Sequence, residues 1–227
     1  MRLVVLGTDT GVGKTRVGCA LVRSLRDRGV DVAVSKPVES GADTGDGVLR
    51  PADAIALAEA AGGAPLDLVC PWPLPRPVTP AEELEIHAPD VTLDTLAAAA
   101  ARATDGAAVG LIETAGGVHS PLVGTAGSVA LAAALDAPVL LVTRDRLGTI
   151  SVTSTAIDAI RAAGVPLLGC VLNRWVDEPD GDVSLRTNAE WLARLHPSVP
   201  VFAARGDAPP ALVDAVLAAA HASSDRA

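Results

Sequence analysis

Residues 7–15, GTDTGVGKT, place glycines, hydroxyl side chains and one lysine at a spacing suited to phosphate binding. The stretch is close to Gly-x-x-x-x-Gly-Lys-Thr, with one residue more between Gly7 and Gly13, and it joins a short apolar run to a segment of helical period. Gly11 and Gly13 permit backbone conformations that turn N–H groups inward, and the start of the following helix favours an anion. Lys14 is expected to reach the β- and γ-phosphates of a nucleotide, and Thr15 to hold Mg²⁺. An ordinary glycine turn is the alternative, but the full spacing favours nucleotide binding.

Lysine occurs at only two positions, Lys14 and Lys36, although the chain has 18 lysines and arginines. A lysine ammonium is compact and flexible, whereas a guanidinium is planar and rigid. A chain that otherwise uses arginine is expected to keep lysine where such a cation is needed. Lys36 lies in the stretch SKPVESG, directly after an apolar run. Chance is the alternative, and we expect a functional role for both lysines.

Two carboxylates are candidates for a metal site. Mg²⁺ prefers oxygen ligands and keeps several waters, so Thr15 and one or two carboxylates would suffice in a nucleotide site. Glu113 ends the apolar run AAVGLIE and precedes a Gly-Gly turn, which makes it the leading candidate. Asp53 lies in the first turn of a predicted helix, where an acidic residue also favours the helix dipole. Asp43 and Asp46 lie in a glycine-rich loop and are expected to be solvated.

Composition limits the class of protein. A chain of 227 residues suits one domain, residues 1–227, with a substantial core. The net charge of −9 argues against a surface for polyanions, so no nucleic-acid partner is expected. The apolar runs fall well short of the ~20 residues that span a bilayer, and the first of them lacks the length of a signal peptide. We therefore expect a cytoplasmic protein without a membrane partner.

The three cysteines, Cys19, Cys70 and Cys170, are far apart and show no metal-ligand spacing. A zinc site or a disulfide framework is therefore not expected. We expect these residues to be small apolar members of the core.

Short β-rich runs alternate with Ala/Leu-rich stretches of helical period through the chain. Strands are predicted near 2–6, 31–35, 107–112, 138–142, 167–172 and 199–202. Helices are predicted near 14–28, 52–61, 92–103, 124–135, 150–163, 184–195 and 209–220. This alternation predicts an α/β fold, a single-domain P-loop NTPase-type parallel sheet with helices on both faces. The Pro-rich segment 63–91 interrupts it, as a connection or as a functional loop.

Polar residues and glycine turns follow five of the predicted strands. They are residues 7–15, Lys36 with Ser40, Glu113 with TAGG, residues 144–149, and Asn173. In open parallel sheets ligands bind beyond the carboxyl ends of the strands. Their shared placement therefore favours one cleft over five separate solvated strand ends.

Several motifs occur in a characteristic order over nearly the whole chain. They are GTDTGVGKT, SKPVESG, Asp53 in ADAIAL, ETAGG at 113–117, LGTIS at 147–151 and LNRW at 172–175. Together they resemble the dethiobiotin synthetase family, and the first two are the most specific. The resemblance implies an enzyme, usually a homodimer, that uses ATP, Mg²⁺ and CO₂. Its substrate would be a vicinal diamine, 7,8-diaminononanoate, which becomes the cyclic urea of dethiobiotin.

The resemblance also implies roles for the residues at matching positions. The catalytic group would be Lys14, Lys36, Thr10 and Ser40, placed around the phosphates and a carbamate. The nucleotide would contact Gly11, Val12, Gly13, Lys14, Thr15 and Asn173, with Asn173 at the adenine. Mg²⁺ would be held by Thr15, Asp53 and Glu113. The diamine substrate would contact Lys36, Ser40, Thr79, Gly116, Gly117 and Ser151.

The chain departs from the family pattern at two places. Thr114 stands where the family usually has glycine, and Ser151-Val152 stands where it has Asn-His. In the family, that Asn amide helps to hold the substrate carboxylate across the dimer interface. A related ligase for another diamine is therefore one alternative. A P-loop ATPase switch acting on a protein partner is another, although the lysine in SKPVESG favours the ligase.

Overall fold

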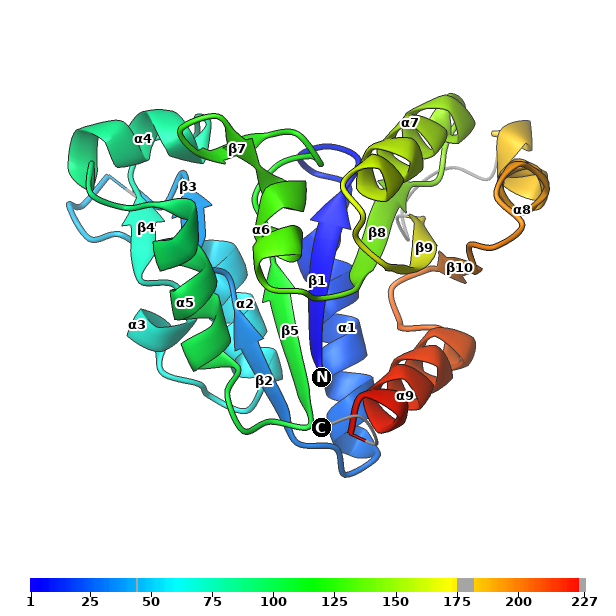
Figure 1. Cartoon of the computed structure of the whole chain (residues 1–227), viewed down its shortest axis with the longest axis horizontal. Coiled ribbons are helices and arrows are strands. Elements are labelled where there is room, and N and C mark those ends of the chain that lie inside the picture. Colours follow the sequence, from blue (N-terminus) through cyan, green and yellow to red (C-terminus); the bar gives the residue numbers. More distant parts are fainter. Residues whose placement is uncertain (44, 175–181, 225–227) are drawn as a thin grey trace.

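A six-stranded sheet forms the centre of the computed structural model, which describes residues 1–43, 45–174 and 182–224 (Figure 1). Its strands, in spatial order, are β10 (Val201–Ala204), β9 (Leu167–Asn173), β8 (Val139–Arg144), β1 (Arg2–Gly7), β5 (Val109–Glu113) and β2 (Val32–Ser35). All neighbouring pairs in this sheet are parallel. Each strand overlaps one predicted from the apolar runs, so the predicted parallel sheet is confirmed.

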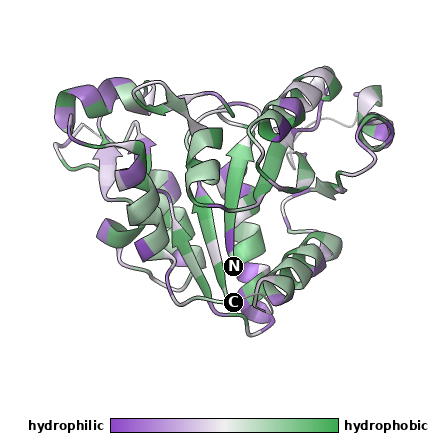
Figure 2. Cartoon of the chain, in the orientation of Figure 1, coloured by the Kyte–Doolittle hydropathy of each residue, from purple (hydrophilic) through white to green (hydrophobic). Residues whose placement is uncertain are grey.

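Alternate residues of the strands pack into two separate cores. On β1, Leu3 and Val5 belong to one core, whereas Val4 and Leu6 belong to the other, as the two-residue period of a strand requires. The first face packs against α1 (Lys14–Asp27), α2 (Ala52–Ala60) and α9 (Pro210–Ser224). The second packs against α5 (Leu93–Ala103), α6 (Ser128–Ala134) and α7 (Thr149–Ala162). Figure 2 shows the apolar strands between these helices, and the predicted helices on both faces are confirmed.

Short elements outside the central sheet form a third packing unit. They are β3 (Val38–Ser40), β4 (Trp72–Leu74), α4 (Pro80–His87), β6 (Pro121–Val123) and β7 (Ala126–Gly127), whereas α3 (Leu66–Val69) packs against the first core through Val69. β3 pairs with β4 in parallel, and a core containing Val38, Leu74 and Leu84 lies beneath them. The Pro-rich segment is therefore more than a connection, because it contributes a strand and two short helices. Strands of two or three residues carry too little periodic pattern to be predicted.

Two predicted helices begin later than expected. The helix predicted over 124–135 starts at Ser128, because residues 121–127 form the β6–β7 hairpin, with Gly124 at a φ of 51°. The helix predicted over 184–195 divides into a 3₁₀ turn, η1 (Val183–Arg186), and α8 (Asn188–Leu195). Asp182 caps the 3₁₀ turn through its carboxylate. Trp175 of the LNRW motif lies outside the described residues.

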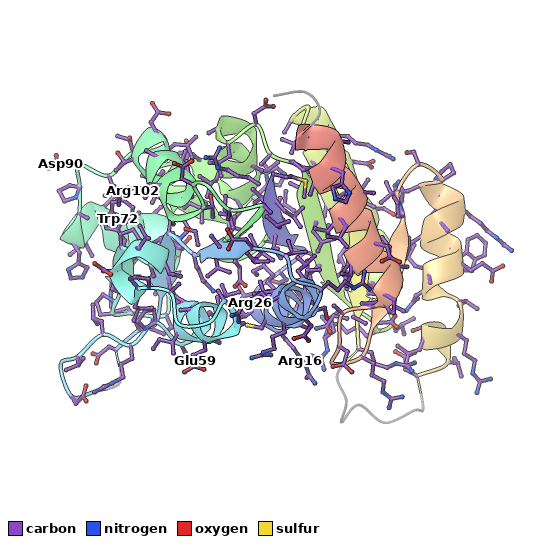
Figure 3. All side chains as sticks on the ribbon, turned by 90° about the horizontal axis from the view of Figure 1, so that it is seen from below. Arg16, Arg26, Glu59, Trp72, Asp90 and Arg102 are labelled. Atoms are coloured by element: carbon purple, nitrogen blue, oxygen red, sulfur yellow. The ribbon has the colours of Figure 1, made fainter. Side chains whose placement is uncertain are left out.

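Arg26 joins two helices that carry predicted site residues. Figure 3, which views the molecule from below, labels Arg26 between α1 and α2. Its Nη1 donates a hydrogen bond of 3.0 Å to the carbonyl of Ala60, the last residue of α2. A carbonyl at a helix C-terminus has no intrahelical partner, so this bond satisfies it. The contact ties α2, which carries Asp53 near its start, to α1.

The cysteines are buried and unpaired with one another, as the sequence predicts. Burial raises the pKa of the Cys19 thiol to about 11, and those of Cys70 and Cys170 to about 12. Among the helices of the described residues, none combines the length and apolarity that a membrane span requires.

Candidate active site

A cavity of about 630 Å³ lies at the carboxyl ends of β1, β5 and β2. Eleven of the predicted site residues line it: Thr10, Gly11, Gly13, Lys14, Thr15, Lys36, Ser40, Asp53, Thr79, Glu113 and Gly116. They come from the phosphate loop, from three strand ends, from the start of α2 and from the Pro-rich segment. The parallel sheet thus brings together residues that are more than a hundred positions apart in the sequence.

The phosphate loop has the backbone that its glycines predict. Gly11 and Gly13 have φ values of 73° and 92°, in the left-handed region where a β-carbon is strained. Gly13 is the N-cap of α1, and it has no side chain to cap the helix. The first N–H groups of a helix have no intrahelical partner, so this start of α1 suits an anion.

The Lys14 ammonium bridges the phosphate loop and the turn after β5. Its Nζ donates to the carbonyl of Asp9 at 3.1 Å and to the carbonyl of Gly116 at 2.7 Å. Burial lowers the pKa of Lys14, and the nearby Glu113 carboxylate opposes that shift. A desolvated ammonium at this point interacts strongly with an anion, because the local dielectric is low.

Lys36, Glu113, Asp53 and Thr15 form one connected cluster. Lys36 Nζ donates to Glu113 Oε1 at 2.8 Å and makes a short contact with Asp53 Oδ2. Thr15 Oγ1 donates to the same Glu113 Oε1 at 2.8 Å. The Glu113 side chain is fully buried, whereas that of Asp53 is about half exposed. The two acidic residues therefore share one cation.

Charges in this cluster stabilise each other. Burial by itself lowers the pKa of Lys36, but Glu113 and Asp53 outweigh it and raise the pKa above the usual lysine value. Burial likewise opposes ionisation of Asp53, but Lys36 outweighs it and lowers the pKa of that carboxyl. Lys36 and Asp53 are therefore both charged near neutral pH.

The cluster offers oxygen donors of the kind that Mg²⁺ prefers. Glu113 and Asp53 both contact one ammonium, so both carboxylates can reach a single cation. Glu113 Oε2 is buried and has no hydrogen-bond partner among the described residues. The hydroxyl of Thr15 lies beside them, and two carboxylates and a hydroxyl leave room for phosphate oxygens. No group of three His, Cys, Asp or Glu suited to a metal occurs in the described residues, so a metal here would also need the Thr15 hydroxyl or oxygens of a ligand.

Glu39 is a cavity residue that the sequence interpretation missed. Its two carboxylate oxygens accept hydrogen bonds from the backbone N–H groups of Asp53 at 3.0 Å and Ala54 at 2.9 Å. The N-cap of α2 is Pro51, whose side chain makes no capping bond, so Glu39 caps this helix from a neighbouring strand. Burial raises the pKa of Glu39, with Lys36 opposing. The sequence does carry one indication of such a cap: the predicted helix begins directly after Pro51, and proline has no side chain that can cap it.

The opposite wall of the cavity comes from short segments outside the central sheet. Thr79 Oγ1 donates to the carbonyl of Pro121 at 3.1 Å. Ser40 Oγ is buried without a hydrogen-bond partner in the described structure, and it lines the cavity. A β-carbon on Gly116, whose φ is 69°, would lie 2.3 Å from Ser120 Oγ, so glycine is required there. Ser120 was missed from the sequence, and its Oγ accepts a 2.7 Å bond from the N–H of Gly117.

Four predicted site residues lie outside this cavity. Val12 lines a second cavity of about 410 Å³ on the other side of the phosphate loop. Gly117 lies beneath the loop, where a β-carbon would be 3.0 Å from the carbonyl of Thr8. Ser151 is exposed in the first turn of α7.

Asn173 is the fourth, and it supports the phosphate loop. Its Nδ2 donates to the carbonyl of Val12 at 2.9 Å, and a β-carbon on Gly13 would lie 2.1 Å from that Nδ2. The amide therefore requires glycine at position 13. Asn173 ends β9, so it lies at the same edge of the sheet as the cavity.

Fold and phosphate loop together define the class. A profile of the AAA domain family matches residues 1–204, and the chain is a P-loop α/β protein of that family. The structure is similar to a ParA family ATPase from Chlorobium tepidum, with a TM-score of 0.55, 12% identity, and coverage of 96% of this chain and 89% of that one. It is also similar to the cell division ATPase MinD of Pyrococcus furiosus, with a TM-score of 0.51, 20% identity, and coverage of 96% and 87%. At such identities the likeness shows the fold alone.

Proteins related in sequence identify the family more narrowly than the fold does. The ATP-dependent dethiobiotin synthetase BioD of Anaeromyxobacter dehalogenans is 42% identical over 194 residues, which cover 85% of this chain and 84% of that protein. The enzyme of the same name from a Caulobacter species is 39% identical over 225 residues, covering 96% of this chain and 94% of that protein. The chain therefore belongs to the dethiobiotin synthetase family, a family of ATP-dependent ligases. The resemblance drawn from its motifs is confirmed.

Proposed function

We propose that this protein closes the cyclic urea of dethiobiotin from 7,8-diaminononanoate, CO₂ and ATP. The observation that carries the proposal is that one cavity is lined both by the phosphate loop and by Lys36 and Ser40, which come from another part of the chain. A switch ATPase needs the phosphate loop alone, whereas a ligase also needs room and polar groups for an acceptor. The names of the sequence relatives support the same choice.

The proposed reaction places negative charge in the site at two stages, first on a carbamate and then on the transferring phosphoryl group. One amine of the substrate adds to CO₂ and loses a proton, which gives a carbamate. A carbamate oxygen attacks the γ-phosphorus, the bond to the β-phosphate oxygen breaks, and ADP leaves. The second amine then attacks the carbonyl carbon of the mixed anhydride, loses a proton and expels phosphate as the ring closes.

The residues on the cavity wall have matching proposed roles. Lys14 binds the β- and γ-phosphates, and Lys36 stabilises the carbamate and the transferring phosphoryl group. Thr10 and Ser40 donate hydrogen bonds to that same centre. Fixed cations in a site of low dielectric stabilise such charge far better than water does. Mg²⁺ held by Thr15, Asp53 and Glu113 would neutralise phosphate charge when bound.

Two further roles concern the ends of the ligands. We propose that Asn173, whose amide donates to the carbonyl of Val12 in the phosphate loop, contacts adenine as the family resemblance implies. Thr79, Gly116 and Gly117 would contact the diamine, and the first two line the cavity. Ser151 would contact the substrate carboxylate only from a neighbouring subunit, because it lies outside the cavity of its own chain.

We also propose that the active unit is a homodimer. Leu147 and Val152 line the second cavity beside the phosphate loop, and these residues are 79% and 53% exposed. Covering such apolar side chains is favourable, and a partner subunit there would bring its own residues 147–152 toward the site. Sedimentation measured beside turnover tests this, since a fully active monomer would contradict it.

The proposed reaction makes ADP release depend on the acceptor. ATP hydrolysis should be slow until both bicarbonate and diaminononanoate are present, because water lacks the positioned nucleophile. Labelled bicarbonate should then appear in a neutral cyclic urea, with one ADP formed per ring. Hydrolysis that ignores bicarbonate and every diamine, yet rises with a protein partner, would favour the ATPase switch.

The substitution at Ser151 makes the carboxylate end of the substrate the place to vary. A series of vicinal diamines with and without a terminal carboxylate should be compared in the same assay. A weak response to diaminononanoate with a strong response to another diamine would keep the mechanism and change the substrate.

A further inference from the structure

Residues 77–80 form one wall of the cavity, and this segment has few backbone hydrogen bonds of its own. Pro77 and Pro80 lack N–H groups, so they cannot donate. The carbonyl of Arg76 accepts bonds from the N–H groups of Gly41 at 2.9 Å and Val78 at 3.0 Å. The position of Arg76 therefore determines where this wall begins.

Glu83, on the first turn of α4, holds Arg76 by two bonds. Its Oε2 accepts from the backbone N–H of Arg76 at 3.0 Å, and its Oε1 accepts from Arg76 Nε at 2.5 Å. A carboxylate that binds both the backbone and the side chain of one residue fixes the direction in which the chain leaves that residue. The other end of the wall is held by the bond from Thr79 to Pro121.

The Arg76–Glu83 pair differs from an ordinary ion pair in a surface loop because one of its two side chains is fully buried. The Glu83 side chain has no exposed surface, although the Arg76 side chain is half exposed. The backbone N–H of Arg76, with its guanidinium, lowers the pKa of the Glu83 carboxyl. His87 Nε2 lies 3.7 Å from Glu83 Oε2, and Glu82 accepts from Arg76 Nη2 at 3.1 Å. A buried carboxylate is costly unless it is hydrogen-bonded, so Glu83 depends on Arg76 as much as Arg76 depends on it.

The wall faces the acceptor side of the cavity. Pro77, Val78, Thr79 and Pro80 line the cavity, whereas Arg76 and Glu83 do not. Through the Gly41 N–H, Arg76 also anchors the residue that follows Ser40. Within the described part of the chain, Glu83 bonds to neither the phosphate loop nor the Lys36 cluster, which the central sheet positions instead.

We infer that Glu83 is a positioning residue which, through Arg76, fixes the 77–80 wall and so sets the affinity of the cavity for its organic substrate without changing nucleotide affinity. The identity of that substrate as a diamine rests on the proposed function. Glu83 touches no reacting group, and its effect passes entirely through the backbone of residues 76–80.

The test replaces Glu83 by Gln and measures two quantities. Glu83→Gln keeps an acceptor but removes the charge that holds the guanidinium. The KM for diaminononanoate should rise about tenfold, the equivalent of one hydrogen bond to a charged group, while the KM for ATP stays within about twofold. Hydrogen exchange of the Gly41 and Val78 amides should become faster, because both bond to the carbonyl of Arg76.

Two other variants serve as controls for the Glu83→Gln experiment. Arg76→Ala removes the guanidinium bond to Glu83 but keeps the backbone N–H bond, so it should shift the same KM in the same direction by a smaller factor, and it replaces Glu83→Gln if that variant fails to fold. Asp214→Asn breaks the exposed 2.5 Å pair with Arg28, between α9 and α1, and should change neither quantity.

Each result decides the inference. A KM for the diamine within twofold of the wild type, or an equal rise in the KM for ATP, overturns it, because a merely structural role would produce either result. If the wild-type protein turns over no diamine at all, the proposed function fails. The exchange measurement then decides the positioning role alone, and unchanged exchange at Gly41 and Val78 overturns it.

Discussion

The two sides of the cavity are built in different ways. The nucleotide side is one continuous loop between β1 and α1, completed by residues at the ends of β5 and β2 in the central sheet. The acceptor side is assembled from short pieces around 40–41, 77–80 and 115–120, which belong to two-stranded ladders and loops. The six-stranded central sheet supports the first side, whereas two short two-stranded ladders and a few side-chain bonds support the second. Changes on one side should therefore leave the ligand of the other largely unaffected.

The largest effect is expected from Lys14→Ala, on the nucleotide side. The variant loses charge-assisted bonds to phosphate in both the ground state and the transition state. We expect kcat/KM for ATP to fall by about 10³-fold or more, and calorimetry to show no tight ATP binding. Circular dichroism should show an intact fold. Unchanged affinity and turnover would refute the phosphate-loop assignment.

Lys36→Ala should separate binding from turnover. Lys36 is proposed to act mainly as the phosphoryl group moves, so kcat should fall about 10²–10³-fold while ATP affinity changes much less. The variant also leaves the buried Glu113 carboxylate without its cation, which typically costs about 3–5 kcal/mol.

Lys36→Arg is the matched control for that prediction. It keeps a cation beside Glu113, so urea unfolding should show more stability than in Lys36→Ala. Turnover should remain low, because a planar guanidinium does not replace a compact ammonium. Wild-type kcat in either variant at saturating substrates would contradict the catalytic role.

Glu39→Ala should have an intermediate effect, because Glu39 supports Asp53 rather than a ligand. Loss of this helix cap should lower the free energy of unfolding by about 1 kcal/mol. The Mg²⁺ concentration needed for half-maximal turnover should rise several-fold, and calorimetric binding of Mg²⁺ with ADP should weaken in parallel. Glu39→Gln keeps an acceptor for the N–H of Asp53 and should lie closer to wild type. Equal behaviour of the two variants would show that charge, and not capping, is what matters.

The difference between the two sides of the cavity also explains which features can be predicted from the sequence. The six central strands are buried apolar runs, and the phosphate loop is a contiguous motif, so both are visible in the order of residues. Glu39 and Glu83 were not identified, because each acts through backbone N–H groups of another element, and no local spacing records such a contact. β3 and β4 were missed because strands of three residues show no period. No sequence pattern points to Ser120. Its role is visible only in the structure, where its side chain occupies the space beside Gly116.

Thr114→Gly should have the smallest effect on activity, although it lies in the ETAGG motif and departs from the family pattern. The Thr114 side chain is buried, and its Oγ1 donates to the carbonyl of Val5 at 3.3 Å, within the sheet and away from the cavity lining. Restoring glycine removes this contact and adds backbone freedom, so stability should fall by roughly 1–3 kcal/mol in urea unfolding. The KM values for ATP and for the diamine should stay within about twofold of wild type. Gly116→Ala, two residues later, provides the contrast, because its β-carbon would displace Ser120 and should raise the KM for the diamine. A large kinetic effect of Thr114→Gly would mean that the turn after β5 moves as one unit, and that the two sides of the cavity are coupled through it.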